Sequence, residues 1–239
     1  MSAGEETNLA RLTRREFAER MASGGLHACI VPVGATEQHH AHLAFGNDWR
    51  SVFYIAQRTA ERLRPHVLVA PAVMAGVSEH HMKHPGTLTL RPATFLAVLD
   101  DVVHSMVRAG FANVLVLNGH GGNNAPVAGV WDQLLRLHQV NLQFLSYWDV
   151  LNAQDAAELL RGGSRMPEDL PGHAGEFETA LASAAFPEDV RRDAATGTAA
   201  LADADQGREF LRRIVERLTA YLREMMDGTR VAEVPPFYP

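Results

Sequence analysis

The sequence has little of what several common protein classes need. Cys29 is the only cysteine among 239 residues, which excludes a disulfide framework and a zinc site built on thiolates. No apolar run approaches the roughly 20 residues of a membrane span, and the N-terminal segment lacks the apolar core of a signal peptide. The formal net charge of −6 argues against nucleic acid or an anionic membrane as a partner. We therefore expect a cytoplasmic protein that binds neither.

Histidine, by contrast, is abundant, with 12 in the chain. Eight of these fall in short stretches that are also rich in glycine, proline, asparagine or carboxylates: His39, His40, His42, His80, His81, His84, His120 and His173. Scattered surface histidines would not concentrate in such turn-like segments, so these stretches are candidates for chemistry. We expect structural or solvent-exposed roles for His66, His104 and His138, and the same interpretation is favoured for His27.

Short apolar runs alternate with helical patterns along the chain. The runs predict buried strands at 28–33, 67–71 and 142–148, and one within 113–124 that ends in a glycine-rich turn. One helix is predicted from a capping box at Thr13 to residue 21. Further helices are predicted over 49–63 and 92–110, from the glycine-rich turn to about residue 138, and over 175–185 and 205–226. We expect a single α/β domain over residues 1–239, with a mostly parallel β-sheet flanked by helices on both faces.

Three of the histidine-bearing turns, at 34–48, 76–87 and 118–124, each follow a predicted strand. Ligands of parallel sheets bind beyond the carboxyl ends of the strands. These turns are therefore expected to converge on one edge of the sheet.

Glu37, His39 and Asp48 form the first candidate group. Glu37 and His39 are two residues apart in an extended segment, so their side chains point to the same side. Asp48 stands at the predicted start of a helix, where it could simply cap backbone N–H groups. Taken together, nitrogen and carboxylate ligands suit Zn²⁺, Mn²⁺ or Fe²⁺. The neighbouring His40 and His42 are either further ligands or wall residues.

The remaining candidates lie in three further turns. His120 follows a buried strand in NGHGGN, which is neither a dinucleotide fingerprint nor a phosphate loop, and the alternative is a structural turn with an incidental histidine. His173 is suited to general acid–base work. Glu176 and Glu178 stand in the first turn of the next predicted helix, where the helix dipole alone would favour carboxylates. The polar loop over 76–87 is expected to form a pocket wall, and an ordinary surface loop is the alternative.

Four segments, in this order, resemble the motifs of the creatininase (creatinine amidohydrolase) family: VPVGATEQHHAHLAFGND, GVSEHHMKHPGTLTL, NGHGGN and HAGEFETA. They span about 150 residues, and four ordered motifs are far more specific than any one alone. The resemblance implies an α/β fold with a two-metal site at the carboxyl end of the sheet, often in hexamers.

Carried over position by position, the resemblance implies that Glu37 and His120 hold one metal. It implies that His39 holds the other and that Asp48 bridges the two. In creatininase itself a further carboxylate ligand follows two residues after the third-motif histidine, where this sequence has Gly122.

Family members with glycine at that position typically carry a glutamate three residues after the last-motif histidine. That residue is Glu176 here, as a ligand or as a catalytic base, with Glu178 as the alternative. His173 matches the catalytic histidine of the family. From the residues themselves, the polar 76–87 loop and the glycine turn, which permits close approach of a ligand, predict a group of substrate-binding residues: Ser78, His80, His81, Gly121 and Gly122. This sequence departs from the family at His40, where glycine is usual, and at Ala44, where proline is usual. Both departures alter the pocket lining.

The predicted function is that of a metal-dependent amidohydrolase. Two divalent ions (Zn, Mn or Fe) would activate a water that attacks a cyclic amide or a related C–N bond in a small-molecule substrate. One alternative is a ring-opening or isomerising reaction on a keto-polyol or a modified peptide, and another is a catalytically silent metal-binding scaffold. The expected quaternary structure is a homo-oligomer.

Overall fold

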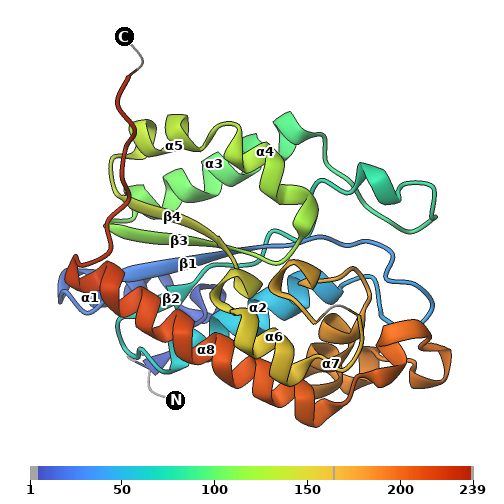
Figure 1. The fold of residues 1–239 in the computed structure, drawn as a ribbon. Helices are drawn as coiled ribbons and strands as arrows, with labels where there is room; N and C mark the ends of the chain where they lie inside the picture. The colour runs from blue at the N-terminus through green and yellow to red at the C-terminus, as the bar shows by residue number, and fades with distance from the viewer. Residues whose placement is uncertain (1–4, 164, 238–239) are drawn as a thin grey trace.

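The sheet sets the position of the loops that carry the candidate residues. The computed structural model describes residues 5–163 and 165–237. Within these residues, the parallel strands lie side by side in the order β2 (Val67–Val69), β1 (Ala28–Val33), β3 (Asn113–Asn118) and β4 (Asn141–Ser146) (Figure 1). The last residues of β1, β3 and β4 pair with one another, so these strands end along one line. The predicted α/β fold with a parallel sheet is confirmed.

Helices cover both faces of this sheet (Figure 1). On one face lie α3 (Pro92–Arg108), α4 (Asn124–Ala128) and α5 (Trp131–His138). On the other face lie α2 (Asn47–Glu61), α6 (Ala153–Leu159), α7 (Glu176–Ala185) and α8 (Ala204–Asp227). The first helix, α1 (Arg14–Ala22), begins at the predicted capping box of Thr13 and Glu16. The fold is thus a three-layer arrangement with the sheet in the middle.

The strands contribute side chains to two apolar cores, one on each face of the sheet. In β1, Ala28 and Ile30 belong to the core beneath α2 and α8, whereas Cys29 and Val31 belong to the core beneath α3 and α5. This division follows from the period of two in a strand. It also explains the continuous apolar run, since the residues of β1 are all buried.

Two strands are shorter than the sequence predicts. β2 ends at Val69 and β4 ends at Ser146, each two residues early. At the end of β4 the carboxylate of Asp149 accepts a hydrogen bond of 3.1 Å from the backbone N–H of Ser146, which starts the 3₁₀ helix Tyr147–Val150 (η5). The chain therefore turns away from the sheet where β4 ends, at the edge where the loops with the candidate residues lie.

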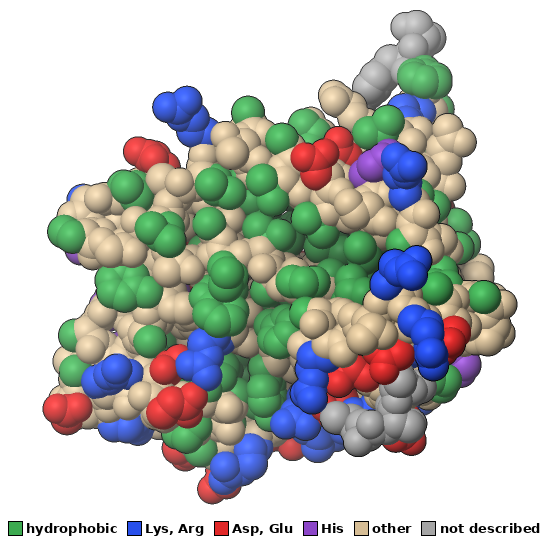
Figure 2. All heavy atoms as spheres, turned by 180° about the vertical axis from the view of Figure 1, so that it is seen from behind, with side chains coloured by type: hydrophobic (Ala, Val, Ile, Leu, Met, Phe, Trp, Pro, Cys, Tyr) green, Lys and Arg blue, Asp and Glu red, His purple; other side chains and the backbone are tan. Residues whose placement is uncertain are grey.

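Hydrophobic side chains gather across the middle of the face shown in Figure 2, with many charged side chains below them. Among the exposed large apolar residues, Phe45, Met74, Met82 and Leu88 come from the loops between β1 and α3. No helix in the described part of the chain is both long and apolar enough to cross a bilayer.

Candidate metal centre

Loops beyond the strand ends bring acidic and imidazole side chains together. Glu37 and His39 lie in the turn after β1, Asp48 lies in the first turn of α2, and His120 follows β3 directly. Glu178 lies in the first turn of α7. Each of these five residues is at most 4% exposed. The predicted convergence of the loops at one sheet edge is confirmed for these positions.

Asp48 lies between the two imidazoles. Its Oδ1 is 2.8 Å from Nε2 of His39, and its Oδ2 is 3.1 Å from Nδ1 of His120. On the outer sides, Oε2 of Glu178 is 3.6 Å from Nε2 of His39, and Oε1 of Glu37 is 3.4 Å from Nδ1 of His120. These five residues, called the metal group below, form two halves that share Asp48. The Asp48 side chain does not cap α2.

Each imidazole is anchored by the nitrogen that faces away from the carboxylates. Nδ1 of His39 donates to the carbonyl oxygen of Glu37 at 3.1 Å, and Nε2 of His120 donates to the carbonyl oxygen of Val77 at 3.0 Å. A carbonyl oxygen only accepts, so the proton is on that nitrogen and the other one carries a lone pair when the ring is neutral. Metal-binding histidines are commonly oriented in this way.

Several ligand-type atoms in the group have no partner. Oε2 of Glu37, Nε2 of His39 and Oδ2 of Asp48 are buried and form no hydrogen bond of acceptable direction with the described residues, despite the short distances. Leaving a buried polar group unsatisfied costs about 1–3 kcal/mol, so such atoms are rare. Imidazole nitrogen and carboxylate oxygen are ligands of Zn²⁺, Mn²⁺ and Fe²⁺. The residues present therefore fit metal ions.

The electrostatics of the group favour cations. Burial alone would lower the pKa of the His39 and His120 imidazoles, but the neighbouring carboxylates raise both pKa values to about 10. Burial raises the pKa of Glu178 to about 8, and the charges of Asp48 and Glu37 add to this effect. For Asp48 burial also acts upward, but the two imidazoles outweigh it and lower the pKa. Once the protons on the two imidazoles and on Glu178 are displaced, the three carboxylates carry a negative charge that divalent cations would neutralise.

The sequence-based preference for Glu176 requires correction. Its Oε1 accepts a hydrogen bond of 2.9 Å from the backbone N–H of Arg161, and its Oε2 accepts one of 2.9 Å from that of Gly162. Gln206 also donates to Oε1. Residues two apart on a helix point in nearly opposite directions, so Glu176 faces away from the cluster that Glu178 reaches. Glu176 is therefore neither at the metal group nor placed to act as a base there.

This difference predicts opposite results for two matched variants. Glu178→Gln is expected to lower the metal content, because it removes a carboxylate from the cluster. Glu176→Gln is expected to keep the metal and to lower stability by about 1–3 kcal/mol, because the new amide would set N–H groups against backbone donors. Elemental analysis and thermal unfolding measure the two effects. A metal loss confined to Glu176→Gln would contradict the placement.

A cavity of about 330 Å³ lies above the group. Besides Glu37, Asp48, His120 and Glu178, its lining consists of His80, His81, Gly119, Gly121, Gly122, Pro171 and His173. Nδ1 of His173 is 3.5 Å from Oε1 of Glu37, and the His173 ring centroid is 4.6 Å from that of His39. The sequence-predicted His80, His81, Gly121 and Gly122 thus line the same cavity as the metal group.

Ser78 does not line this cavity, which corrects its assignment as a substrate-binding residue. It is fully buried, and its Oγ lies 3.3 Å from Nε2 of His120. Ser78 directly precedes the 3₁₀ turn Glu79–His81 (η3), which carries His80 and His81 to the cavity while Ser78 faces inward. Its contact is with a candidate ligand and not with a substrate.

Gly122 explains one departure from the creatininase pattern. A Cβ at this position would lie 2.2 Å from the carbonyl oxygen of Val77 and 2.4 Å from Nε2 of His120. No side chain fits there without displacing His120. A carboxylate ligand at 122 is therefore excluded by sterics in this chain.

Gln38, which the sequence did not single out, has contacts beside the cavity, and the structure also places the sequence-predicted candidates His40 and His42. Gln38 contacts His81 and His173 through its side-chain amide. His40, at the position where the family usually has glycine, has a φ of 56°, in the left-handed region that glycine adopts most easily. The backbone conformation thus accounts for the family's glycine. Its neighbour His42 is buried and lies 2.9 Å from Oγ1 of Thr179, away from the metal group.

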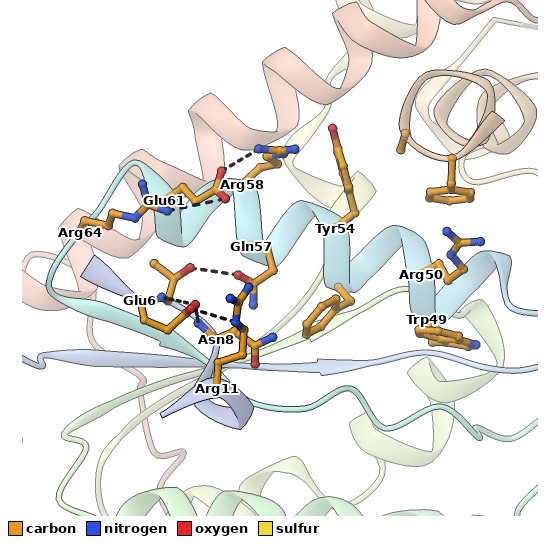
Figure 3. Close-up of a pocket in the computed structure, with 14 residues that line it drawn as sticks. Glu6, Asn8, Arg11, Trp49, Arg50, Tyr54, Gln57, Arg58, Glu61 and Arg64 are labelled. Carbon is orange, nitrogen blue, oxygen red and sulfur yellow. Dashed lines mark hydrogen bonds and ion pairs between the residues drawn. The ribbon is translucent and has the colours of Figure 1, made fainter. Parts of the chain in front are cut away.

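A second cavity, also of about 330 Å³, lies on the outer face of α2 (Figure 3). Its charged side chains pair with one another: Arg11 with Glu6 at 3.1 Å, and Arg58 with Glu61 at 2.9 Å. No histidine is among its lining residues. Because its charges are compensated and it offers no mixed ligand group, the cavity at the strand ends is the better candidate for catalysis.

The loops of the metal group lie in a segment that matches a known protein family. The family model described as "Creatininase: Creatinine amidohydrolase" matches residues 10–199, a range that contains all the loops of the metal group. The chain belongs to the creatininase family. The resemblance read from the four motifs is thereby confirmed.

Curated relatives within the creatininase family have different names. The chain is 29% identical over 196 residues to "Creatinine amidohydrolase" of Pseudomonas putida, covering 77% of this chain and 74% of the relative. It is 29% identical over 190 residues to "3-dehydro-scyllo-inosose hydrolase" of Thermotoga maritima, covering 78% of this chain and 58% of the relative. It is also 29% identical over 168 residues to "Mycofactocin precursor peptide peptidase" of Mycolicibacterium smegmatis, covering 69% and 60%.

Solved creatininase structures share the fold. A crystal structure of creatinine amidohydrolase superposes with a TM-score of 0.83 at 24% identity and covers 93% of this chain and 98% of that chain. A manganese form of creatininase superposes with a TM-score of 0.80 at 25% identity and covers 92% and 99%. The chain is therefore a creatininase-family protein with candidate metal ligands, and its relatives are named for hydrolysis of different substrates.

Proposed function

We propose that this protein is a metal-dependent hydrolase that cleaves a C–N bond of a cyclic amide or a related small molecule. The observation that carries the proposal is the buried group of ligand-type side chains beneath the cavity, with its unpartnered atoms: Glu37, His39, Asp48, His120 and Glu178. The name of the Pseudomonas putida relative supports amide chemistry.

We propose that the site takes two divalent ions, Zn²⁺, Mn²⁺ or Fe²⁺. Glu37 and His120 would hold one, His39 and Glu178 would hold the other, and Asp48 would contact both. Bound divalent ions lower the pKa of water toward neutrality and polarise a carbonyl group. The protein's part is to orient these ligands beneath the cavity.

His173 is proposed to move the proton. In hydrolysis the water oxygen forms a bond to the carbonyl carbon, the C–N bond breaks, and the proton released by the water reaches the leaving nitrogen. Burial, together with the nearby His39, lowers the pKa of His173 to about 4. The ring is therefore neutral at pH 7, and it can pass its N–H proton to the leaving nitrogen while the proton released by the water replaces it.

Relatives in the family are named for substrates of different chemical classes. Two relatives are named for an inosose and for a peptide, so a keto-polyol or a modified peptide is the alternative to a cyclic amide. A cavity of about 330 Å³ suits a small molecule or the end of a peptide. A catalytically silent scaffold is disfavoured, because such a protein would be free to lose these ligands.

A substrate panel tests the proposal. The purified protein, loaded with zinc or manganese, is incubated with cyclic amides, formamides, lactones, keto-polyols and short peptides. Hydrolysis of an amide that stops after chelation and returns with added metal is expected. Hydrolysis confined to lactones or keto-polyols would reject the C–N assignment, and metal-independent or absent turnover across the panel would reject the hydrolase.

Metal uptake is expected to strengthen with rising pH. His39 and His120, with pKa values of about 10, and Glu178, with a pKa of about 8, carry protons at pH 7 in the metal-free protein. Metal binding must displace these protons, so up to about three are released and the affinity rises between about pH 6 and pH 8. Calorimetry in buffers of different ionisation enthalpy measures the release. Proton uptake, or an affinity that falls with pH, would contradict it.

We further propose that the protein is a cytoplasmic homo-oligomer, for which the motif resemblance implies a hexamer. Large apolar side chains are exposed on the loops between β1 and α3, at Phe45, Met74, Met82 and Leu88, and such residues would be available to an interface. Light scattering that gives the monomer mass of 26.2 kDa would reject the oligomer.

A further inference from the structure

Gln38 lies between two candidate ligands in the chain, and its side chain reaches two other histidines. Its Oε1 accepts a hydrogen bond of 3.0 Å from the backbone N–H of His40. Its Nε2 lies 2.9 Å from Nδ1 of His81 and 2.9 Å from Nε2 of His173. The two rings stack with centroids 4.2 Å apart. One amide thus contacts both imidazoles on this side of the cavity.

The backbone contact fixes which way the amide points. The N–H of His40 can only donate, so the atom of Gln38 that faces it is the oxygen. The NH₂ group therefore faces the imidazoles. It has two hydrogens and no accepting atom, one hydrogen for each ring. The ring nitrogens that receive them must carry lone pairs.

This constraint assigns the tautomers of both neutral rings. His173 accepts at Nε2, so its proton is on Nδ1, which lies 3.5 Å from Oε1 of Glu37. His81 accepts at Nδ1, so its proton is on Nε2, which lies 3.7 Å from the same oxygen. Both N–H groups are directed toward the side of the cavity where Glu37 lies.

We propose that Gln38 is a positioning residue that sets the tautomer and orientation of His173, so that the nitrogen exchanging protons with the substrate is Nδ1. This inference rests on the proposed function for its catalytic meaning, although the tautomer itself does not depend on turnover. With Nε2 of His173 occupied by the amide, only Nδ1 faces the reacting atoms. Gln38 acts through the imidazole and does not itself touch the substrate.

The principal test reads the tautomer directly in the metal-free protein. Long-range ¹H–¹⁵N correlation spectra at about pH 8, where free histidine is neutral, distinguish Nδ1–H from Nε2–H rings. Loss of the signal in His173→Gln assigns it. Wild-type His173 is expected in the Nδ1–H form, and Gln38→Glu is expected to move the proton to Nε2, because a carboxylate can only accept. An Nε2–H ring in the wild type would overturn the proposal, whether or not any substrate is hydrolysed.

A second test separates positioning from a role in the turn alone. Gln38→Glu keeps an acceptor for the N–H of His40 but has no donor for the rings, whereas Gln38→Met has neither. If Gln38 positions His173, both variants should lose about 10- to 100-fold in kcat, with KM and metal content close to wild type. If Gln38 only stabilises the turn, Gln38→Glu should retain wild-type kcat, which would refute the positioning role. Gln133→Glu, exposed on α5, controls for the added charge.

Discussion

Replacing Asp48 with alanine is expected to remove bound metal from both halves of the site and to reduce turnover by at least about 10³-fold. The reason is its position: one oxygen lies 2.8 Å from Nε2 of His39 and the other lies 3.1 Å from Nδ1 of His120. No other carboxylate in the group is within 3.3 Å of either imidazole nitrogen. Loss of Asp48 therefore affects both proposed ions at once, whereas loss of Glu178 affects one.

The matched control for this variant is Asp155→Ala. Asp155 is also buried, but its carboxylate pairs with Arg213 and Arg217 and belongs to no candidate metal-binding group. We expect this variant to be less stable and to keep its metal. Elemental analysis and thermal unfolding compare the two proteins. Wild-type metal content in Asp48→Ala and in His120→Ala would refute the assignment of the site.

Replacing His173 with glutamine is expected to lower kcat by about 10²- to 10⁴-fold, the usual range for loss of a general acid–base group. Metal content should stay unchanged, because the proposed ligand set does not include His173. Steady-state kinetics of the metal-loaded protein give the rate, and elemental analysis gives the metal content. His84→Gln, an exposed histidine of the 76–87 loop, should behave as wild type.

Two outcomes would contradict this role for His173. A metal-loaded variant with unchanged turnover would remove the residue from the reaction. A variant that loses metal would make His173 a ligand, which its spacing to Glu37 and His39 also permits. In that case its proton-transfer role would have to pass to another side chain of the cavity.

The sequence was sufficient for the fold and for most of the metal group. Buried strands read as apolar runs because helices cover both faces of the sheet, and the candidate ligands Glu37, His39, Asp48 and His120 follow strands or lie at the start of a helix. The choice between Glu176 and Glu178 was not accessible, because both stand in the first turn of α7 and only its rotation about the axis decides which one points inward.

Other features depended on contacts between distant segments. Ser78 turns inward because the following 3₁₀ turn is anchored beside His120, which follows a different strand. Gln38 carries no periodic or compositional signal, and its partner His173 is 135 residues away in the chain. Such contacts are set by the packing of the loops and not by local pattern.

The candidate ligands meet at the common end of β1, β3 and β4 but are far apart in the sequence, and this has a consequence for how the protein matures. The candidate ligands extend from Glu37 to Glu178, so the set is incomplete until α7 has been synthesised and packed against α2 and α8. The full metal affinity would therefore require the complete tertiary structure. The free energy of metal binding would stabilise that structure and not the partly folded chain. The proposed ions would be the last component of assembly, and bound metal would measure the fraction of chains that have reached the native topology.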